Sequence, residues 1–118
     1  MNENLSILIV DDDPDILDGI LMILESRDYH LRTARDGLQC LDLLKEEIPD
    51  LLILDLLMPG MSGVDTGRAL KQIKPDIKIF LSSGYPLECL SETTAMLEYE
   101  GFLDKPFGID TLSEKLKI

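Results

Sequence analysis

Two apolar runs in the sequence end directly in acidic residues. Residues 7–10 (Ile-Leu-Ile-Val) are followed by Asp11, Asp12 and Asp13, and residues 51–54 (Leu-Leu-Ile-Leu) are followed by Asp55. Short continuous apolar runs are typical of parallel strands that are covered on both faces. If these strands are neighbours, three or four carboxylates lie close together, and each close pair repels by roughly 3 to 4 kcal/mol at an effective dielectric near 20. Such crowding predicts raised pKa values or a bound cation.

The ligand types define the cation that would fit this cluster. Carboxylate oxygens without a nearby Cys or His favour a hard divalent ion, so we expect Mg²⁺, with Mn²⁺ or Ca²⁺ as substitutes. Few protein ligands leave room for waters and a phosphate oxygen, which suits phosphoryl chemistry. The alternative is that residues 11–13 only cap a helix. A second acid at the end of another strand favours the functional interpretation.

Two more reactive side chains follow predicted strands further along the chain. Ser83 comes after residues 77–81, and Lys105 comes after residues 101–104. Each by itself is typical of a turn serine or a solvated lysine. Together with the acids they would supply a nucleophilic carboxylate, metal ligands, a hydroxyl donor and an ammonium group, each at the end of a different strand.

The positions of these side chains depend on an alternation of strands and helices. Besides the two apolar runs, residues 30–34, 77–81 and 100–104 have strand character, and the first and last of these are the more polar. Alternating strands and helices predict an α/β fold with right-handed crossovers and a doubly wound, five-stranded parallel sheet. Edge polarity favours the strand order 2-1-3-4-5. Ligands then bind where the order reverses, between the first and third strands.

Helical spacing appears between the predicted strands. The first helix follows an Asp13-Pro14 start, and a second runs from near Asp36 to Pro49. A third ends before Pro75, a weaker helix spans residues 86–97, and a last one starts near Ile109 and is still running at Ile118. The expected core stripes are Ile16, Leu17, Ile20, Ile23 and Leu24 in the first helix, Leu38, Leu41, Leu44 and Ile48 in the second, and Val64, Ala69, Leu70 and Ile73 in the third.

Composition excludes several classes of protein. The chain has 118 residues and a net charge of −12, and we expect it to form one soluble acidic domain over residues 1–118. The negative charge argues against direct binding of nucleic acid or anionic membranes and favours cations or basic surfaces as partners. Two separated cysteines, Cys40 and Cys89, predict idle thiols in a reducing compartment. No signal peptide or membrane-spanning run is visible, so we expect a cytoplasmic protein.

Four ordered blocks of the sequence resemble the receiver domain of two-component response regulators. They are residues 8–13 (Leu-Ile-Val-Asp-Asp-Asp), residues 54–63 (Leu-Asp-Leu-Leu-Met-Pro-Gly-Met-Ser-Gly), residues 82–85 (Ser-Ser-Gly-Tyr) and residues 103–107 (Leu-Asp-Lys-Pro-Phe). The resemblance covers the whole chain. It implies a flavodoxin-like three-layer sandwich in which Asp55 accepts a phosphoryl group from a phosphohistidine on a sensor histidine kinase or histidine phosphotransfer protein.

The resemblance also implies roles for the surrounding residues. Asp11, Asp12, Asp55 and the backbone carbonyl of Leu57 would hold Mg²⁺, and Lys105 would pair with the phosphoryl oxygens. Ser83 and the aromatic Phe102 would form the switch, and the peptide bond between Lys105 and Pro106 would be cis. The domain would be a signalling acceptor with self-phosphotransfer and slow self-hydrolysis as its only chemistry.

Other functions fit parts of the pattern. A phosphatase with an aspartate nucleophile needs a second acid two residues later, and the sequence has Asp55-Leu56-Leu57 instead. A non-phosphorylated interaction module on the same fold usually lacks an acidic or lysine position, and all of them are present here. The only histidine, His30, lies in a predicted edge strand and is interpreted as structural. Homodimerisation, the stimulus and the output are left open.

Overall fold

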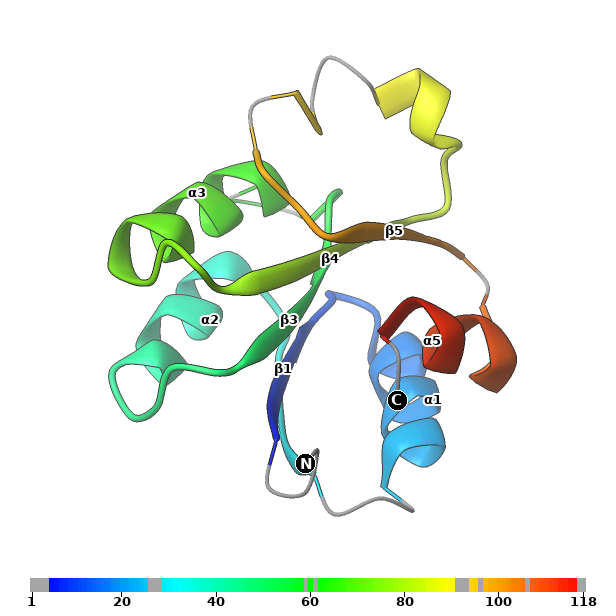
Figure 1. The fold of residues 1–118 in the computed structure, drawn as a ribbon, viewed down its shortest axis with the longest axis horizontal. Helices are drawn as coiled ribbons and strands as arrows, with labels where there is room; N and C mark the ends of the chain where they lie inside the picture. The colour runs from blue at the N-terminus through cyan, green and yellow to red at the C-terminus, as the bar shows by residue number, and fades with distance from the viewer. Residues whose placement is uncertain are drawn as a thin grey trace.

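The predicted strands form one parallel sheet in the computed structural model, which describes residues 5–25, 29–58, 60, 62–90, 94, 95, 97–105 and 107–116. The strands are β1 (Ser6–Val10), β2 (His30–Ala34), β3 (Leu51–Asp55), β4 (Lys78–Ser83) and β5 (Gly101–Asp104). Their order is β2-β1-β3-β4-β5, and all neighbours are parallel (Figure 1). The predicted order is confirmed, and it reverses between β1 and β3.

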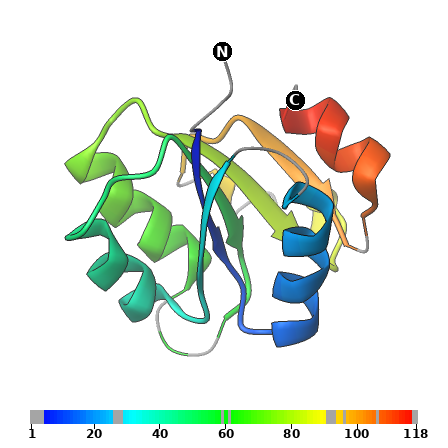
Figure 2. The same ribbon diagram turned by 90° about the horizontal axis from the view of Figure 1, so that it is seen from below.

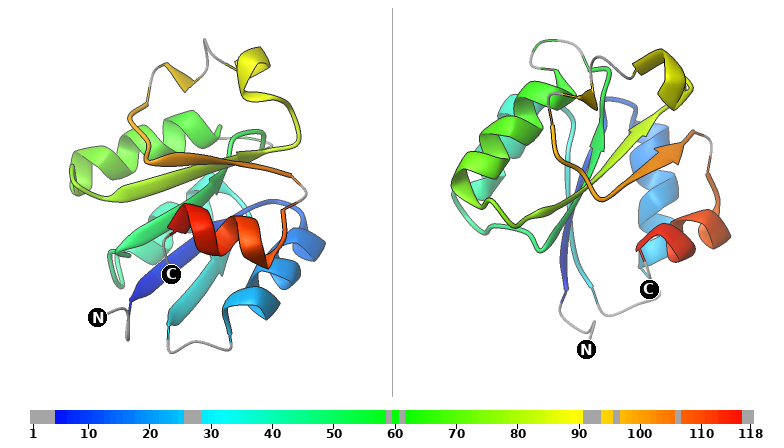
Figure 3. Two further views of the ribbon diagram at one scale, coloured as in Figure 1. Left: turned by 45° about the vertical axis from the view of Figure 1, so that its right-hand side comes forward. Right: turned by 45° about the horizontal axis from the view of Figure 1, so that its top comes forward.

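Helices cover both faces of this sheet. The described helices are α1 (Pro14–Leu24), α2 (Gly37–Leu44), α3 (Gly63–Ile73), the 3₁₀ helix η1 (Leu87–Leu90) and α5 (Ile109–Leu116). α1 and α5 lie on one face, and α2 and α3 lie on the other, as the views in Figures 2 and 3 show. The result is the expected three-layer α/β sandwich.

The hydrophobic core consists of two layers divided by the sheet. Because successive side chains of a strand point to opposite faces, Leu8 and Val10 of β1 pack with α2 and α3, while Ile7 and Ile9 pack with α1 and α5. β1 and β3 are buried along their whole length, whereas β2 and β5 are partly exposed. This difference confirms that the more polar strands form the edges.

The second helix differs from the prediction in its end and in its buried face. α2 ends at Leu44, five residues before Pro49, and Cys40 rather than Leu38 lies on the buried side, with Leu38 66% exposed. After α2, the guanidinium of Arg32 on β2 donates to the carbonyl oxygens of Leu43 at 3.0 Å and Glu47 at 2.8 Å, which ties this segment to the sheet.

The expected helix over residues 86–97 is only partly covered by the described residues, and in this described part Thr94 is α-helical. This part begins with η1, where the Cys89 N–H donates to the Pro86 carbonyl at 3.0 Å, and the Leu97 N–H donates to the Thr94 carbonyl at 3.1 Å. Both bonds join residues three apart, the spacing of a 3₁₀ turn. The predicted helical segment therefore begins as a 3₁₀ helix.

Candidate functional site

Three carboxylates meet at the point where the strand order reverses. Asp11 follows β1 directly, Asp12 is the next residue, and Asp55 ends β3. One oxygen from each lies within 4.8 Å of the others. Asp11 and Asp55 are 2% and 3% exposed, and Asp12 is open to solvent. The structure therefore brings together the acids that the sequence singled out, with one of them at the surface.

Asp13 has a different role from the other acids of its run. Its side chain accepts a hydrogen bond from the Asp15 N–H at 2.9 Å and caps α1. The Asp13 N–H in turn donates to Oδ1 of Asp11 at 2.9 Å, which orients that carboxylate. The two interpretations of residues 11–13 thus apply to different residues, because Asp13 caps the helix while Asp11 and Asp12 face Asp55.

Lys105 connects the two buried acids. It follows β5, and its Nζ lies 2.7 Å from Oδ2 of Asp11 and 3.3 Å from Oδ1 of Asp55. The Lys105 side chain is 17% exposed, so its ammonium group is largely shielded from water. The N–H of Leu57 also approaches Oδ1 of Asp55, at 3.4 Å. Within the described part of the chain, no hydrogen bond or ion pair engages Oδ2 of Asp55.

Burial and crowding change the acidity of this site. The pKa of Asp55 is raised from 3.8 to about 6, first by burial and then by the negative charge of Asp11, against the opposing effect of Lys105 and the Leu57 N–H. Burial lowers the pKa of Lys105, but the hydrogen bond with Asp11 and the charges of Asp55 and Asp11 outweigh it and raise the pKa overall. Asp55 is mostly ionised at pH 7, and Lys105 is fully charged.

The donor set fits a divalent metal ion such as Mg²⁺. When all three carboxylates are ionised, Lys105 compensates only one of their negative charges, so two remain without a counter-ion in the cluster. Burial, and after it the negative charge of Asp11, raises the pKa of Asp55 and so disfavours its charged form unless a cation is bound. Oxygen atoms are the only ligands of the cluster, which is the set that Mg²⁺ prefers.

Ser83 lies at the same edge of the sheet but is not joined to the acids. It ends β4, is 1% exposed, and its Oγ accepts a hydrogen bond from the Tyr85 N–H at 3.0 Å. The backbone N–H of Lys105 donates to the Ser83 carbonyl at 2.9 Å, so β4 and β5 hold the serine and the lysine on adjacent strand ends. The hydroxyl of Ser83 forms no described hydrogen bond with Asp55 or Lys105.

The remaining predicted residues surround this centre. Leu57 follows β3, and its side chain is 48% exposed. Phe102 on β5 is 8% exposed and belongs to the core cluster that contains Leu90 and Leu97. Pro106 lies outside the described residues, so the predicted cis bond before it is not assessed.

Gly63 has a role at the site that the motif did not predict. It is the first residue of α3, its N–H donates to the Leu56 carbonyl at 3.2 Å, and a Cβ atom there would lie 2.3 Å from the Asp55 carbonyl oxygen and 2.7 Å from the Leu56 Cα. The start of α3 therefore packs directly on the backbone that carries Asp55. A glycine within the block after the acidic residue was visible in the sequence, but the close approach is a tertiary property.

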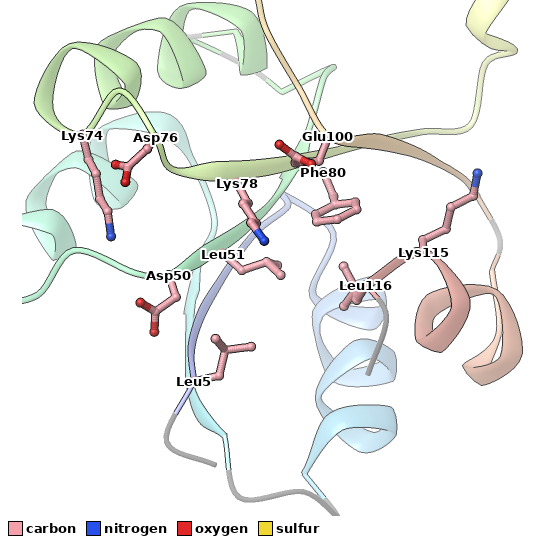
Figure 4. A pocket seen from close by; sticks show the side chains of 10 residues that line it. All are labelled: Leu5, Asp50, Leu51, Lys74, Asp76, Lys78, Phe80, Glu100, Lys115 and Leu116. Carbon is pink, nitrogen blue, oxygen red and sulfur yellow. The ribbon is translucent and has the colours of Figure 1, made fainter. Parts of the chain in front are cut away.

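A large cleft lies at the other end of the sheet, away from the acids. Its volume is about 460 Å³, and it is lined by apolar and charged side chains from the amino ends of several strands and from α5: Leu5, Asp50, Leu51, Lys74, Asp76, Lys78, Phe80, Glu100, Lys115 and Leu116 (Figure 4). The charged groups are spread around an apolar centre and form no salt bridge with one another. A cleft of similar volume, about 470 Å³, borders Asp12 at the carboxyl ends of the strands, so cleft size does not distinguish the two ends of the sheet.

The cysteines and the histidine stand apart from the cluster. Both cysteines are free, and burial raises the pKa of Cys40 to about 12, although Arg32 lowers it, so that thiol is not a nucleophile. His30 begins β2, and its Nε2 lies 3.3 Å from a carboxylate oxygen of Glu47 at the surface. These positions agree with an idle buried thiol and a structural histidine.

An open, doubly wound sheet with buried acids and a lysine at its switch point defines a receiver-type α/β protein. The chain belongs to the response regulator receiver domain family, whose model matches residues 7–117. It is therefore a receiver domain of two-component signalling. Receiver domains are phospho-acceptor signalling modules and not enzymes in the usual sense, and they generally bind Mg²⁺.

Comparison with individual proteins agrees with this assignment. The chain is 34% identical to the sporulation initiation phosphotransferase F of Bacillus subtilis, over 99% of this chain and 93% of that protein. It is 30% identical to the response regulator MprA of Mycobacterium avium over 94% of this chain, but spans only 49% of that protein. The response regulator TrrA of Thermotoga maritima, solved in complex with Mg²⁺-BeF, matches with a TM-score of 0.82 and 32% identity, over 95% of this chain and 96% of that one.

Among the described residues, each helix is too short or too polar to cross a membrane.

Proposed function

We propose that Asp55 accepts a phosphoryl group from a phosphohistidine on a sensor histidine kinase or a histidine phosphotransfer protein. The carrying observation is the contact geometry of Asp55, which is buried beside Asp11 and lies 3.3 Å from the Lys105 ammonium. Similarity to a sporulation phosphotransferase supports a phosphotransfer partner. Such partners place this domain in the cytoplasm, where the kinase modules of two-component systems act.

The residues of the site would perform the transfer as follows. A carboxylate oxygen of Asp55 attacks phosphorus, the phosphorus–nitrogen bond of the phosphohistidine breaks, and the electron pair leaves with the imidazole. Because Asp55 is mostly ionised at pH 7, it needs no general base. Lys105 would hold positive charge beside the phosphoryl group that Asp55 attacks. The main catalytic contribution of the site is positioning of the reactants and neutralisation of their charge.

The acidic residues would hold the metal ion. Asp11, Asp12, Asp55 and the Leu57 carbonyl are the proposed ligands, with waters in the remaining positions. A bound Mg²⁺ neutralises negative charge on the transferred phosphoryl group. The response regulator TrrA, which is similar to this chain, was solved in complex with Mg²⁺-BeF, and this supports metal binding by the present domain.

We infer that Ser83 and Phe102 transmit the modification. The Ser83 hydroxyl accepts from the Tyr85 N–H and keeps its own proton available to donate to a phosphoryl oxygen. A charge-assisted hydrogen bond of about 1.5 to 3 kcal/mol shifts a two-state equilibrium roughly ten- to hundredfold. Inward movement of this loop would change the packing of Phe102, on β5, against the core residues Leu90 and Leu97. Ser83→Ala should therefore keep phosphorylation but lose the change in fluorescence or amide exchange around Phe102, and an unchanged response would contradict the switch.

The partner would approach along a groove that borders Lys105. A cleft of about 120 Å³ is lined by Ile16, Gly19 and Ile23 of α1, with Lys105 and Phe107 on its other side. Because Lys105 faces both this cleft and Asp55, an apolar helix surface seated there would bring its histidine to the acidic cluster. The overall charge of −12 argues against nucleic acid as a direct partner of this domain.

Intact-mass measurement with acetyl phosphate and MgCl₂ tests the proposal. We expect one added phosphoryl group on the wild-type chain, none on Asp55→Asn, and a normal gain on the control Asp76→Asn, whose carboxylate lies at the opposite end of the sheet. Loss of the modification on addition of EDTA would show the metal requirement. A wild-type chain that stays unmodified would favour a non-phosphorylated interaction module on the same fold.

A further inference from the structure

The loops at the carboxyl ends of the strands present a negative surface to an anionic substrate. Their described residues include Asp11, Asp12, Asp13 and Asp36, and Asp55 and Asp104 end two of the strands. A phosphoryl donor carries negative charge and meets this surface before it reaches Lys105. We call this surface, formed by the loops at the carboxyl ends of the strands, the rim of the site. Repulsion between the rim and the donor would slow capture of the donor, unless a positive group at the rim opposes the repulsion.

Arg35 is the exposed cation of this rim. In the described parts of these loops, the basic residues are Arg35 and Lys105, and Lys105 is partly buried in contact with two acids. Arg35 directly follows β2 and is exposed. No carboxylate of the described residues forms a salt bridge with it. Its guanidinium therefore keeps its charge available for a group from outside.

Strand pairing sets Arg35 beside the metal-binding acids. Val10 and Ala34 are register partners in β1 and β2, and the Asp11 N–H donates to the Ala34 carbonyl at 3.1 Å, so Arg35 continues β2 where residues 11 and 12 continue β1. A cleft of about 470 Å³ is lined by Asp12, Arg35, Asp36 and Gln39. Arg35 and Asp12, the exposed member of the acidic cluster, thus line one opening.

The backbone of Arg35 is held in place. Its N–H donates to Oε1 of Gln39 at 2.7 Å, and Oδ1 of Asp36 accepts from the Gln39 N–H at 2.7 Å as the cap of α2. These two bonds fix the turn between β2 and α2 without using the guanidinium. Substitution of the Arg35 side chain consequently leaves the hydrogen bonds of the turn intact.

We propose that Arg35 captures the anionic group of the phosphoryl donor at the rim of the site and is a positioning residue for phosphotransfer. This inference rests on the proposed function of Asp55. Arg35 neutralises neither Asp55 nor the transferred phosphoryl group, because β1 separates β2 from β3. Its effect is on the encounter with the donor and on the affinity for it, and it is screened by salt.

The kinetics of phosphorylation by acetyl phosphate test this role. With saturating MgCl₂ at low ionic strength, Arg35→Gln should raise the KM for acetyl phosphate about three- to tenfold and leave kcat within about twofold, as expected for the loss of one rim charge. Arg35→Glu should raise KM further, and Arg35→Lys should restore most of the wild-type value. The differences should disappear at about 0.5 M salt, where the Debye length is short.

A matched control removes the same charge elsewhere. Lys45 follows α2 at its other end, and its side chain is 80% exposed beside Asp42, so Lys45→Gln changes net charge equally without touching the rim. We expect its KM to stay at the wild-type value. Equal KM values for Arg35→Gln and Lys45→Gln would overturn the proposal.

Affinity for Mg²⁺ distinguishes capture from a structural role. Loss of a cation near Asp12 removes repulsion, so Arg35→Gln should bind Mg²⁺ as tightly as the wild type or more tightly by calorimetry, while the donor binds less tightly. If Arg35 only held the loop, the affinities for Mg²⁺ and donor would fall together, which would refute the proposal. A wild-type chain that never gains a phosphoryl group would refute the function of Asp55, whereas normal modification with no effect of Arg35 would refute only its role.

Discussion

The two ends of the parallel sheet contain similar side chains in different arrangements. At the amino ends, three acids and three lysines surround a cleft of about 460 Å³, and all except Lys74 are exposed. At the carboxyl ends, Asp11 and Asp55 are buried and both contact Lys105. The first group of charges is spread out in water, and the second is concentrated away from it.

The difference shows that shielding and convergence, more than the number of charges, make a reactive site. Coulombic interactions are weak where water surrounds each charge and several-fold stronger where the effective dielectric falls. At the carboxyl ends, the consequence is the raised pKa of Asp55 and a strong demand for positive charge. Charge-matched substitutions at the two ends should therefore have very different effects.

The largest difference is expected between two lysines. Lys105→Gln removes the ammonium group beside Asp55, and we expect the rate of phosphorylation to fall about 10² to 10³-fold, the usual effect of losing one preorganised charge in a shielded site. Lys78→Gln changes an exposed lysine of the amino-end cleft and should leave the rate within twofold. Initial rates from intact mass with acetyl phosphate measure both, and equal rates would remove the distinction between the two ends.

Close backbone packing at the carboxyl end gives the next prediction. Gly63→Ala would place a Cβ atom 2.3 Å from the Asp55 carbonyl oxygen, and we expect the free energy of unfolding to fall by about 3 kcal/mol. Gly19→Ala is the control, since nothing lies within 4 Å of a Cβ in this interior position of α1, and it should stabilise the chain by about 0.5 to 1 kcal/mol. Urea unfolding of both variants provides the measurement. A neutral Gly63→Ala would show that α3 can move away from Asp55.

The charge of Asp55 should destabilise the metal-free fold in a pH-dependent way. Its pKa is higher in the folded chain, about 6, than its ordinary value of 3.8, so the folded state holds more protons between these values. Stability of the wild type therefore falls as pH rises through this window, by roughly 3 kcal/mol in total. Asp55→Asn lacks this loss of stability. Its advantage over the wild type, measured as the difference in the free energy of unfolding, should be absent at pH 3 and complete near pH 7.

Urea unfolding from pH 3 to pH 8 without metal, with Asp76→Asn as the control, measures this advantage. Addition of Mg²⁺ at pH 7 should reduce it, because the ion stabilises the wild-type carboxylates. An advantage that does not depend on pH would contradict the assigned acidity of Asp55.

The smallest expected effect concerns the lifetime of the phosphorylated state. Leu57 is 48% exposed next to Asp55, and its aliphatic side chain cannot orient a hydrolytic water, so we expect a comparatively long-lived acyl phosphate. Leu57→Asn adds hydrogen-bonding groups there and should speed loss of the phosphoryl group about tenfold. Met22→Asn, at a 72% exposed position of α1, is the control. Decay that is already fast, with no difference between Leu57 and its Asn variant, would refute this prediction.

Much of the fold follows from local patterns in the sequence. Apolar runs in β1, β3 and β4 predicted buried central strands because a strand between two helical layers has no solvent-facing side. Acids placed directly after β1 and β3 then predicted the cluster, since the carboxyl ends of parallel strands meet at one edge. The N-cap of α1 at Asp13 followed from the local Asp-Pro signal.

Long-range contacts explain the features that the sequence did not predict. The segment after α2 is held by Arg32, on another element, which donates to the carbonyl groups of Leu43 and Glu47. The buried face of α2 turns toward Cys40 and not Leu38 because packing against the sheet decides between neighbouring stripes of similar hydrophobicity.

The sequence by itself determined the order of the elements and the chemical groups at the ends of the strands, because these depend on residue type and on periodicities of two and 3.6 residues. Only the tertiary structure decided which oxygens Lys105 contacts, how deeply Asp55 is buried, and how closely Gly63 lies against it. The reason is that distance and dielectric environment are properties of packed segments distant in the chain, and the acidity of a carboxylate depends on both.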